Sequence, residues 1–500
     1  MPKPVDLRQG NVASLADRLP IPRYDRAGLV VGIAHIGVGA FHRSHHAAYL
    51  DRLFEQGESR DFAVCGIGVL DTDVADIAAL ASQDCLYTLA LRHPDGHWDG
   101  RVIGSIRDVR HVHDDVGGVL ETLAAPTTRI MSLTITEGGY NLDPRGLFDL
   151  SNPQIARELS GEGSPTSVFG LTVAALRLRR ERGLDPFTIM SCDNIEANGV
   201  VAQSAFLGYA AACDESLAAW IAEHGAFPNS MVDRITPRTT SRVQAEIEER
   251  FGVRDLMPVT AEPFVQWVLE DDFPLGRPAY ERAGVQMVSD VRPFELMKLR
   301  LLNGSHQALA YLGLLAGHHY VHQAAADPDI ARFVRAYMAH EAAATLPAVP
   351  DTDLDAYQSE LMIRFGNREI EDTLDRVAAY PSDRMPKFVL PVLSQLARDG
   401  RDLPLGTALL AAFAGFCLGL SEDGQPLDLL DFEADSLRGS AAHWVQSAGD
   451  FLALPFIPED LRQSPDFVRA FAAASAVLRE SGVRRLMATA LQGSGGGRIE

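Results

Sequence analysis

Residues 28–45, GLVVGIAHIGVGAFHRSH, are the most informative about the fold. Its first part, residues 28–39, is a continuous apolar run that ends in glycines, as in a strand buried on both faces of a parallel sheet. A helical pattern follows at once, so Gly37 and Gly39 stand where the strand gives way to the helix. In dinucleotide-binding folds the pyrophosphate lies there, because one glycine permits the tight turn and the next lets the backbone approach closely.

Three later segments repeat the buried-strand character, with helical patterns between them. They are FAVCGIGVL (62–70), TRIMSLTIT (128–136) and DPFTIMSCDN (185–194). Strands that alternate with helices predict right-handed crossovers and a doubly wound parallel sheet. The expected fold class is therefore α/β, with an N-terminal Rossmann-type domain. His42 replaces the third glycine of the G-x-G-x-x-G fingerprint, so a purely structural turn is the alternative interpretation.

After about residue 285 the strand patterns fade and a 3.6-residue periodicity dominates. Helical segments are expected at 295–316, 327–346, 387–399, 404–420 and 465–491. The sequence thus predicts a Rossmann-type domain with extensions over residues 1–285 and a mainly α-helical substrate and catalytic domain over residues 286–492. The glycine-rich tail, residues 493–500, is expected to be flexible.

The composition excludes several classes of protein. A formal net charge of −22 argues against nucleic acid and anionic membrane surfaces as partners, because both attract basic patches. The longest apolar run, residues 408–420, is too short for a bilayer, which takes about 20 residues. The first residues lack the apolar core of a signal peptide, and five scattered cysteines without a C-x-x-C pair indicate a reducing compartment. We expect a cytoplasmic protein; its oligomeric state stays open, and a monomer is compatible with the sequence.

Two aspartates after the second predicted strand bear on the cofactor. Asp71 and Asp73 follow the apolar residues of that strand directly. An acidic side chain at this place hydrogen-bonds the ribose hydroxyls of NAD and repels the 2′-phosphate of NADP. The next residues contain no arginine or lysine for that phosphate, so NAD is the expected cofactor. The alternative role for one of the two aspartates is to cap the next helix.

Four histidines around the glycine turn raise the question of a metal. They are His35, His42, His45 and His46. Histidines at i and i+4 can bind zinc from one face of a helix. No cysteine or carboxylate has a suitable spacing beside them, and Arg43 lies in their midst. We therefore expect no metal site.

The segment ELMKLRLLNGSH, residues 295–306, places polar residues in an otherwise apolar helical run. In an α-helix, Glu295, His306 and Asn303 would lie at about 60°, 80° and 140° from Lys298, so all four share one side. A buried lysine without a function is costly. The alternative is a lysine that packs its stem in the interior and reaches solvent with its head group.

A second polar segment, SCDNIEANG (191–199), follows a predicted strand. Ligands bind at that edge of an open α/β sheet. The carboxamide of Asn194 can donate to an oxyanion there, as Asn303 can from its helix. Lys298, with its pKa lowered by burial, would take the proton of an alcohol. Together these residues predict metal-free oxidation of an alcohol, with hydride transfer to nicotinamide.

Six ordered blocks resemble the polyol-specific long-chain dehydrogenase/reductase family, the mannitol dehydrogenase family. They are GVGAFHRSHHAAYLD (37–51), SLTITEGGY (132–140), SCDNIEANG (191–199), MVDRITP (231–237), EPFVQWVLEDDF (262–273) and KLRLLNGSH (298–306). The resemblance covers about residues 25–490. It implies a Rossmann-type domain followed by a mainly helical domain, and a metal-free NAD enzyme that interconverts D-mannitol and D-fructose.

The resemblance also implies roles for single residues. Lys298 corresponds to the general base, Asn194 and Asn303 to the oxyanion-holding asparagines, and Glu295 to a glutamate that exchanges the proton with solvent. The remaining correspondences are His306, Asp233, Arg376 and Arg384 for the substrate and Gly37, Gly39, Phe41, Asp71, Asp73 and Glu137 for the cofactor, with Asp73 as the best match to the NAD-selecting residue.

One departure from the family concerns Arg384, because related enzymes commonly have lysine at this place. Arginine presents a planar fork of donors where lysine presents a point charge. The preferred polyol therefore stays open. The alternatives within the family are D-arabinitol, sorbitol and a hexuronate, whose carboxylate Arg376 and Arg384 could clamp. Two alternatives lie outside the family's chemistry. A regulatory NAD-binding protein without turnover would not need Lys298, Asn194 and Asn303 together. A metal-dependent dehydrogenase would lose its activity on chelation.

Overall fold

The computed structural model describes residues 3–143, 145–162, 164–444 and 447–494. The chain forms two compact units, Met1–Arg292 and Pro293–Glu500, each with a hydrophobic core of its own. The boundary predicted after residue 285 falls inside the first unit, where strand β13 (Gln286–Val288) follows it. Of the predicted tail, residues 495–500 lie outside the described part, and Gly493 ends the last helix.

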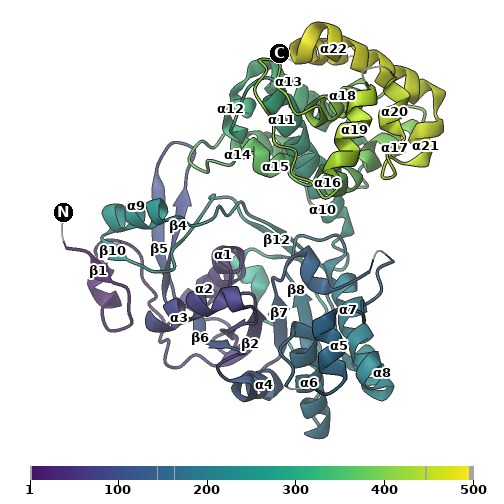
Figure 1. The fold of residues 1–500 in the computed structure, drawn as a ribbon. Coiled ribbons are helices and arrows are strands. Elements are labelled where there is room, and N and C mark those ends of the chain that lie inside the picture. Colours follow the sequence, from purple (N-terminus) through teal and green to yellow (C-terminus); the bar gives the residue numbers. More distant parts are fainter. Residues whose placement is uncertain (1–2, 144, 163, 445–446, 495–500) are drawn as a thin grey trace. The chain divides into compact units, whose positions relative to one another are not determined.

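A five-stranded parallel sheet forms the centre of the first unit (Figure 1). In sheet order its strands are β6 (Ile106–His111), β3 (Ala63–Gly68), β2 (Val31–Ile36), β7 (Ile130–Leu133) and β8 (Thr188–Ser191). Four of these are the predicted strands, and their order is that of a nucleotide-binding doubly wound sheet, which confirms the predicted α/β class. The strand order reverses between β2 and β7, and such a switch point is where open α/β sheets bind ligands.

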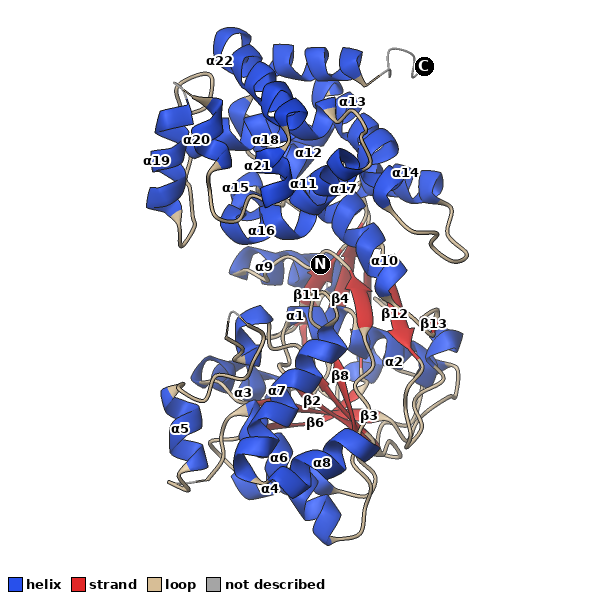
Figure 2. Cartoon of the chain, turned by 90° about the vertical axis from the view of Figure 1, so that its right-hand side faces the viewer, coloured by secondary structure: helices blue, strands red, loops and turns tan. Residues whose placement is uncertain are grey.

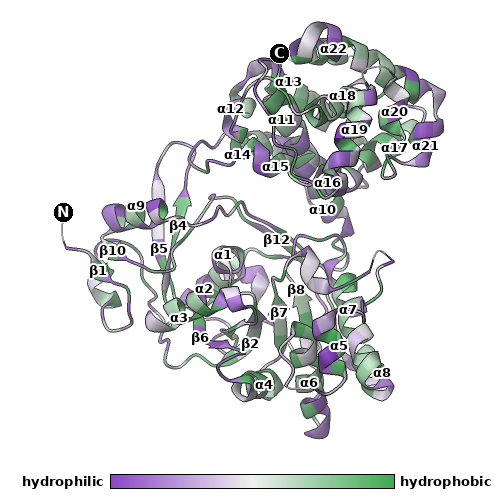
Figure 3. Cartoon of the chain, viewed as in Figure 1, coloured by the Kyte–Doolittle hydropathy of each residue, from purple (hydrophilic) through white to green (hydrophobic). Residues whose placement is uncertain are grey.

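Helices cover both faces of this sheet. From β2, Ile33 packs into one hydrophobic cluster, whereas Ala34 and Ile36 pack into another on the opposite face. The covering helices are α2 (His46–Glu55) in the first cluster and α4 (Val116–Ala124), α6 (Val168–Glu181) and α7 (Asn198–Cys213) in the second. Because both faces are buried, β2, β3, β7 and β8 carry mostly hydrophobic residues (Figure 3), and this is the pattern visible in the sequence.

Further strands and helices, most of them outside the predicted segments, complete the first unit. The strands are β1 (Val5–Asp6), β4 (Tyr87–Arg92), β5 (Trp98–Ile103), β9 (Ser230–Asp233), β10 (Val253–Arg254), β11 (Val259–Ala261), β12 (Gln266–Glu270) and β13. The helices are α1 (Ala40–Ser44), α3 (Val74–Ser82), α5 (Pro153–Leu159), α8 (Glu215–His224) and α9 (Ser241–Phe251). Several of these strands mix buried and exposed residues irregularly, so their patterns are weak in the sequence.

The second unit is built from helices and loops, as predicted (Figure 2). Its α-helices are α10 (Arg292–Met297), α11 (Gly304–Leu315), α12 (Val321–Ala326), α13 (Pro328–Ala336), α14 (Leu354–Phe365), α15 (Leu374–Ala378), α16 (Pro381–Phe388), α17 (Leu390–Arg398), α18 (Pro404–Cys417), α19 (Ala434–Trp444), α20 (Ala448–Leu452), α21 (Glu459–Gln463) and α22 (Pro465–Gly493). Two π-helical segments, Lys298–Asn303 and Tyr337–Ala342, interrupt this pattern.

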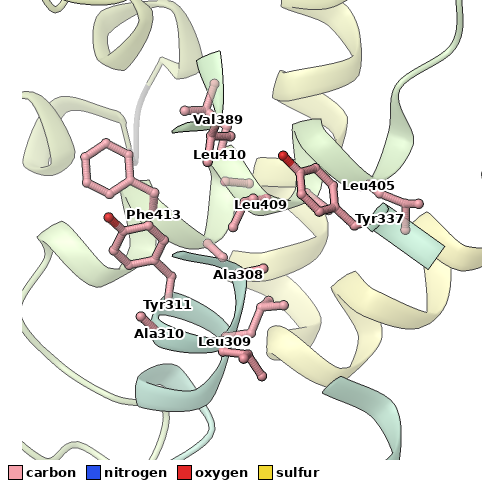
Figure 4. Close-up of a cluster of buried hydrophobic side chains, with 14 of the residues drawn as sticks. Ala308, Leu309, Ala310, Tyr311, Tyr337, Val389, Leu405, Leu409, Leu410 and Phe413 are labelled. Atoms are coloured by element: carbon pink, nitrogen blue, oxygen red, sulfur yellow. The ribbon is translucent and has the colours of Figure 1, made fainter. Parts of the chain in front are cut away.

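Helices α11 and α18 form the centre of this core. All residues of α11 are buried, and so are all residues of α18 after Pro404. Tyr311 of α11 faces Phe413 of α18 with 5.1 Å between the ring centroids (Figure 4). The apolar run 408–420, expected to be a buried helix, lies largely in α18. Within the described residues, no helix combines the length and the apolar character that a membrane span requires.

Candidate active site

The glycine turn lies at the carboxyl end of β2, beside the switch point of the sheet. Gly37 has a φ of +92°, and a Cβ atom there would lie 2.2 Å from the carbonyl oxygen of Thr134, so only glycine fits. A Cβ atom on Gly39 would meet no atom within 4 Å, which leaves this stretch of backbone open to an approaching group. The turn therefore has the two properties that a pyrophosphate-binding turn needs.

His42, at the third position of the fingerprint, packs flat on His35 of strand β2. The two ring centroids lie 3.4 Å apart, with 16° between the ring planes. The Nε2 atom of His35 lies 3.0 Å from the carbonyl oxygen of Gly37, and its Nδ1 lies 2.8 Å from Oγ of Ser132. A carbonyl only accepts, so Nε2 carries the proton and Nδ1 accepts from the serine. A stacked imidazole pair thus occupies the place where the fingerprint has a glycine.

His35, His42 and His46 are buried together, with one nitrogen of each within 4.8 Å of the others. The stacking of His35 and His42 sets their in-plane lone pairs side by side, whereas ligands of one ion must converge on it. Both nitrogens of His35 already have protein partners, and Nε2 of His46 lies 3.0 Å from the hydroxyl of Tyr280. The cluster therefore fits aromatic packing better than a metal site. Phe41, the predicted cofactor neighbour, stacks on His45 at 5.0 Å.

These histidines should make the first unit sensitive to acid. Burial lowers the pKa of His35 to about 3, and burial together with the other histidines holds the pKa of His42 and His46 well below 6.5. Arg43 and His45 also disfavour a charge on His42, and Nε2 of His46 faces the hydroxyl of Tyr280. The unfolded chain therefore binds more protons below about pH 6.5, and stability should fall by about 1.4 kcal/mol per pH unit for each histidine.

His42→Phe keeps a stacked ring but removes one of these titrating groups. Urea unfolding between pH 7.5 and 5 should show a free energy of unfolding whose slope with pH is smaller by up to about 1.4 kcal/mol per pH unit than in the unmodified protein. His224→Phe is the control, because His224 is partly exposed and should leave the slope nearly unchanged. Equal slopes for the His42 variant and the unmodified protein would contradict a neutral, buried His42.

The carboxyl ends of β7 and β8 carry the next predicted residues. Glu137 begins the turn after β7 and Asn194 comes three residues after the end of β8; both are exposed. Because β2, β7 and β8 are adjacent and parallel, Glu137 and Asn194 lie at the same edge as the glycine turn. The structure thus gathers these predicted residues of the first unit along one edge of the sheet.

Asp233, the predicted substrate residue of this unit, is the last residue of β9 and is buried. Sequence reasoning missed the residue that ties this strand to β8. The Nδ2 of Asn198 donates to the carbonyl oxygens of Asp193 (3.0 Å) and Ser230 (2.7 Å), and its Oδ1 accepts from the amide of Ser230 (2.9 Å). No pattern in the sequence distinguishes Asn198 from an ordinary helix-start residue, since its partner lies 32 residues away.

The two aspartates after β3 have different surroundings. Asp73 accepts from the backbone amides of Val69 (3.1 Å) and Leu70 (3.0 Å) through Oδ2, so it shapes the turn in which it lies. The side chain of Asp71 is 91% exposed and lies 3.2 Å from Nδ1 of His113. Asp71 is therefore the aspartate whose carboxylate is presented outward.

In the second unit, Lys298 and Asn303 lie in a π-helical segment instead of the α-helix assumed from the sequence. In a π-helix the hydrogen bonds run from i to i+5, so a turn holds more residues than in an α-helix, and Asn303 follows Lys298 by slightly more than one turn. The two side chains therefore share a side of the helix more closely than the α-helical angle of about 140° predicts. Such π-segments occur frequently at functional sites. The predicted grouping stays a prediction, but the α-helix assumed for this segment is wrong.

Polar groups around this segment are buried. Lys298 and Glu295 are each 6% exposed and His306 is 8% exposed, and the ring of His306 packs on Phe365 at 4.6 Å. Within the described part of the chain, the buried Oδ1 of Asn303 has no hydrogen-bond partner. A buried carbonyl oxygen in this condition is costly, and a ligand that carries hydroxyl groups would satisfy it.

Arg376 and Arg384, the predicted substrate arginines, are neighbours. Arg376 forms a two-bonded pair with the carboxylate of Asp372, at 2.5 Å for each bond. Nη1 of Arg384 donates to the carbonyl oxygens of Arg376 (3.0 Å) and Val377. The Nε2 of Gln307, the residue after His306, donates to the same Val377 oxygen, which links α11 to this turn. Arg384 therefore binds backbone carbonyl oxygens through Nη1.

Comparison with known proteins gives the same family over both units. Residues 31–282 match the Mannitol dehydrogenase Rossmann domain, and residues 290–478 match the Mannitol dehydrogenase C-terminal domain. The chain is 42% identical to the mannitol 2-dehydrogenase of Cereibacter sphaeroides over 472 residues, covering 93% of this chain and 98% of that one.

Two solved structures resemble this one over nearly their whole length. A Pseudomonas fluorescens mannitol 2-dehydrogenase, in a ternary complex with NAD and D-mannitol, is 41% identical with a TM-score of 0.86, covering 98% of this chain and 100% of that one. A D-sorbitol dehydrogenase in substrate-free form is 35% identical with a TM-score of 0.90, covering 97% and 100%.

Proposed function

The chain belongs to the mannitol dehydrogenase family, and we propose that it oxidises D-mannitol to D-fructose with NAD. Membership makes it a polyol dehydrogenase. The finer assignment is supported by the mannitol 2-dehydrogenases among its relatives, one of which has NAD and D-mannitol bound. The observation that carries the chemistry is the buried Lys298 in the same short π-helical segment as Asn303, whose amide oxygen lacks a partner within the described chain and could accept from a substrate hydroxyl.

The glycine turn fits a dinucleotide. Gly37 has no room for a side chain, Gly39 has open space in front of it, and the exposed Asp71 stands at the end of the neighbouring strand. NAD, when bound, supplies the acceptor for the hydride that leaves the carbinol carbon. Gly37, Gly39 and Phe41 would hold its pyrophosphate side, Asp71 its ribose, and Glu137 the part that reaches the ends of β7 and β8.

Residues of the second unit transfer the proton of the reaction. Lys298, as an amine, takes the proton from the C2 hydroxyl of the polyol, and Glu295 passes it on towards solvent. Asn303 and Asn194 donate N–H groups to the oxygen as its negative charge grows. His306, Asp233 and Arg376 bind further hydroxyl groups, and Arg384 keeps the backbone around Arg376 in place. The site needs no metal for this chemistry, because the carboxamides already stabilise the oxyanion.

A polyol and ketose panel tests the proposal. D-mannitol, sorbitol and D-arabinitol are offered with NAD and with NADP, and D-fructose with NADH, while absorbance of the reduced cofactor is followed. D-mannitol with NAD should give the highest kcat/KM, and chelators should not change it. Sorbitol is the second candidate, because a D-sorbitol dehydrogenase has a closely similar structure. Absence of turnover with every polyol would refute the proposed function.

Cofactor preference should depend on Asp71 more than on Asp73. Asp71→Ala removes an outward-facing carboxylate that repels a 2′-phosphate, so the ratio of kcat/KM for NADP to that for NAD should rise. Asp73→Ala removes two backbone hydrogen bonds and should chiefly lower the melting temperature. Steady-state kinetics with both cofactors checks this. A larger change of the ratio in the Asp73 variant would assign the selection to Asp73 instead.

A further inference from the structure

Asp193 is a buried carboxylate for which the proposed reaction has no direct use. It is 6% exposed and accepts three hydrogen bonds. Its Oδ1 accepts from the amide of Thr136 (2.8 Å), and its Oδ2 accepts from the amide of Ile135 (3.1 Å) and the hydroxyl of Tyr140 (2.7 Å). No ion pair with a cation is found for it in the described part of the chain. Hydrogen-bond donors of the turn after β7 therefore hold this carboxylate.

The backbone segment whose amides Asp193 binds is strained. Thr136 has φ +63° and ψ +169°, a region that essentially only glycine occupies without strain. Such a conformation persists only where surrounding contacts over-determine it. The two oxygens of Asp193 bind two consecutive amides, one of them that of Thr136 itself. Glu137, a predicted cofactor residue, is the next residue along the chain.

Asp193 also precedes Asn194 directly, so one side chain connects the ends of two neighbouring strands. β7 and β8 are paired from Ile130↔Thr188 to Leu133↔Ser191. After this paired stretch, the carboxylate of Asp193 accepts the hydrogen bonds of the backbone amides of residues 135 and 136, in place of a partner on a neighbouring strand. Tyr140 closes the arrangement, since its hydroxyl lies 2.6 Å from Oγ of Ser191 and 2.7 Å from Asp193.

We infer that Asp193 is a positioning residue, which holds Thr136 in its strained conformation and thereby sets Glu137 and Asn194 relative to each other. The consequence for catalysis rests on the proposed function. The binding of the amides of Ile135 and Thr136 by Asp193, called the clamp below, does not. An asparagine has the same shape as aspartate but carries an NH2 group in place of one acceptor. It would direct a donor at a backbone N–H, so one of the two amide bonds must be lost.

The test is a double-mutant cycle between Asp193→Asn and Thr136→Gly. Asp193→Asn should lower kcat strongly, up to about 10²-fold, because small misplacements of reacting groups have effects of this size. Glycine adopts the conformation of residue 136 without strain, so Thr136→Gly alone should keep kcat close to that of the unmodified protein. The double variant should recover a large part of the loss, at least about fivefold, since contacting residues couple in this way.

Controls separate positioning from folding. Tyr140→Phe keeps the carboxylate and both amide bonds, so its kcat should stay within about fivefold, the effect of one ordinary hydrogen bond. Asp193→Glu serves if Asp193→Asn does not fold, because it keeps the charge and displaces the oxygens. Melting temperatures and circular dichroism are measured for all variants. A folded Asp193 variant with unchanged kcat, or one that Thr136→Gly does not rescue, would overturn the inference.

Hydrogen exchange gives a readout that needs no activity. The amides of Ile135 and Thr136 should exchange more slowly in the unmodified protein than in Asp193→Asn, measured on peptides that span residues 130–140 by mass spectrometry. If the unmodified protein turns over no polyol, the proposed function fails, yet the exchange experiment still decides about the clamp. If the protein is active and exchange at residues 135 and 136 is the same in both proteins, only the clamp is refuted.

Discussion

Lys298→Ala should lose about 10²–10⁴-fold in kcat, the usual contribution of a general base. Lys298 is 6% exposed in the π-segment that also carries Asn303, and we propose no other group that could accept the hydroxyl proton. Lys298 is not among the residues proposed to hold the cofactor, so the Kd for NADH should stay nearly the same. Steady-state kinetics with D-mannitol between pH 6 and 10 and a fluorescence titration with NADH measure both quantities.

Two further variants distinguish a base from a charge at this position. Lys298→Arg keeps a cation, but arginine does not lose its proton in proteins, so it should be about as inactive as the alanine variant. Lys3→Ala removes an exposed lysine of the first unit and should behave like the unmodified protein. Near-normal kcat for Lys298→Ala across the pH range would exclude Lys298 as the base, and high activity of Lys298→Arg would assign it an electrostatic role.

Replacement of either proposed oxyanion donor should reduce kcat by about 10²–10³-fold, as for single donors in other enzymes. Asn194 is exposed at the end of β8, and Asn303 ends the π-segment after Lys298. Their N–H groups interact with an oxygen whose charge grows towards the alkoxide, so KM should change less than kcat. Asn194→Asp and Asn303→Asp should be less active than the alanine variants, because a carboxylate repels the alkoxide.

The measurement is kcat and KM for D-mannitol over a range of pH for all four variants. Asn11→Ala is the control, since Asn11 is exposed in the first unit and its side chain donates a hydrogen bond to the carbonyl of Asp6. If the aspartate variants equal or exceed the alanine variants at the optimal pH, the asparagines stabilise structure and not charge. The proposed mechanism would then be wrong for that asparagine.

The sequence predicts the central sheet because its strands are buried on both faces. β2, β3, β7 and β8 read as apolar runs, and each lies within its predicted segment. Burial on both faces is a local property of the strand, so it is visible without knowledge of the partner strands. Chain order and handedness then restrict how the strands pair. The strands β5 and β6 mix buried and exposed residues, lack such a pattern and were not predicted.

The candidate residues were also predictable in part, because they occur in short motifs. Gly37, Lys298, Asn194 and Asn303 could be selected since an apolar environment makes a polar residue, or a glycine at a strand end, conspicuous. The helix type around Lys298 could not be predicted, because an α-helix and a π-helix of six residues have almost the same composition. Only the hydrogen-bond pattern of the folded chain distinguishes them.

The sheet, the glycine turn and the helical second half follow from the sequence alone, as does the identity of the polar residues, because each depends on neighbours along the chain. What holds these residues in place is visible only in the folded structure. His42 stacks on His35, Asp193 grips amides 57 and 58 residues earlier, and Arg384 binds backbone carbonyls. Contacts of this kind leave no periodicity in the sequence, because folding alone brings their partners together.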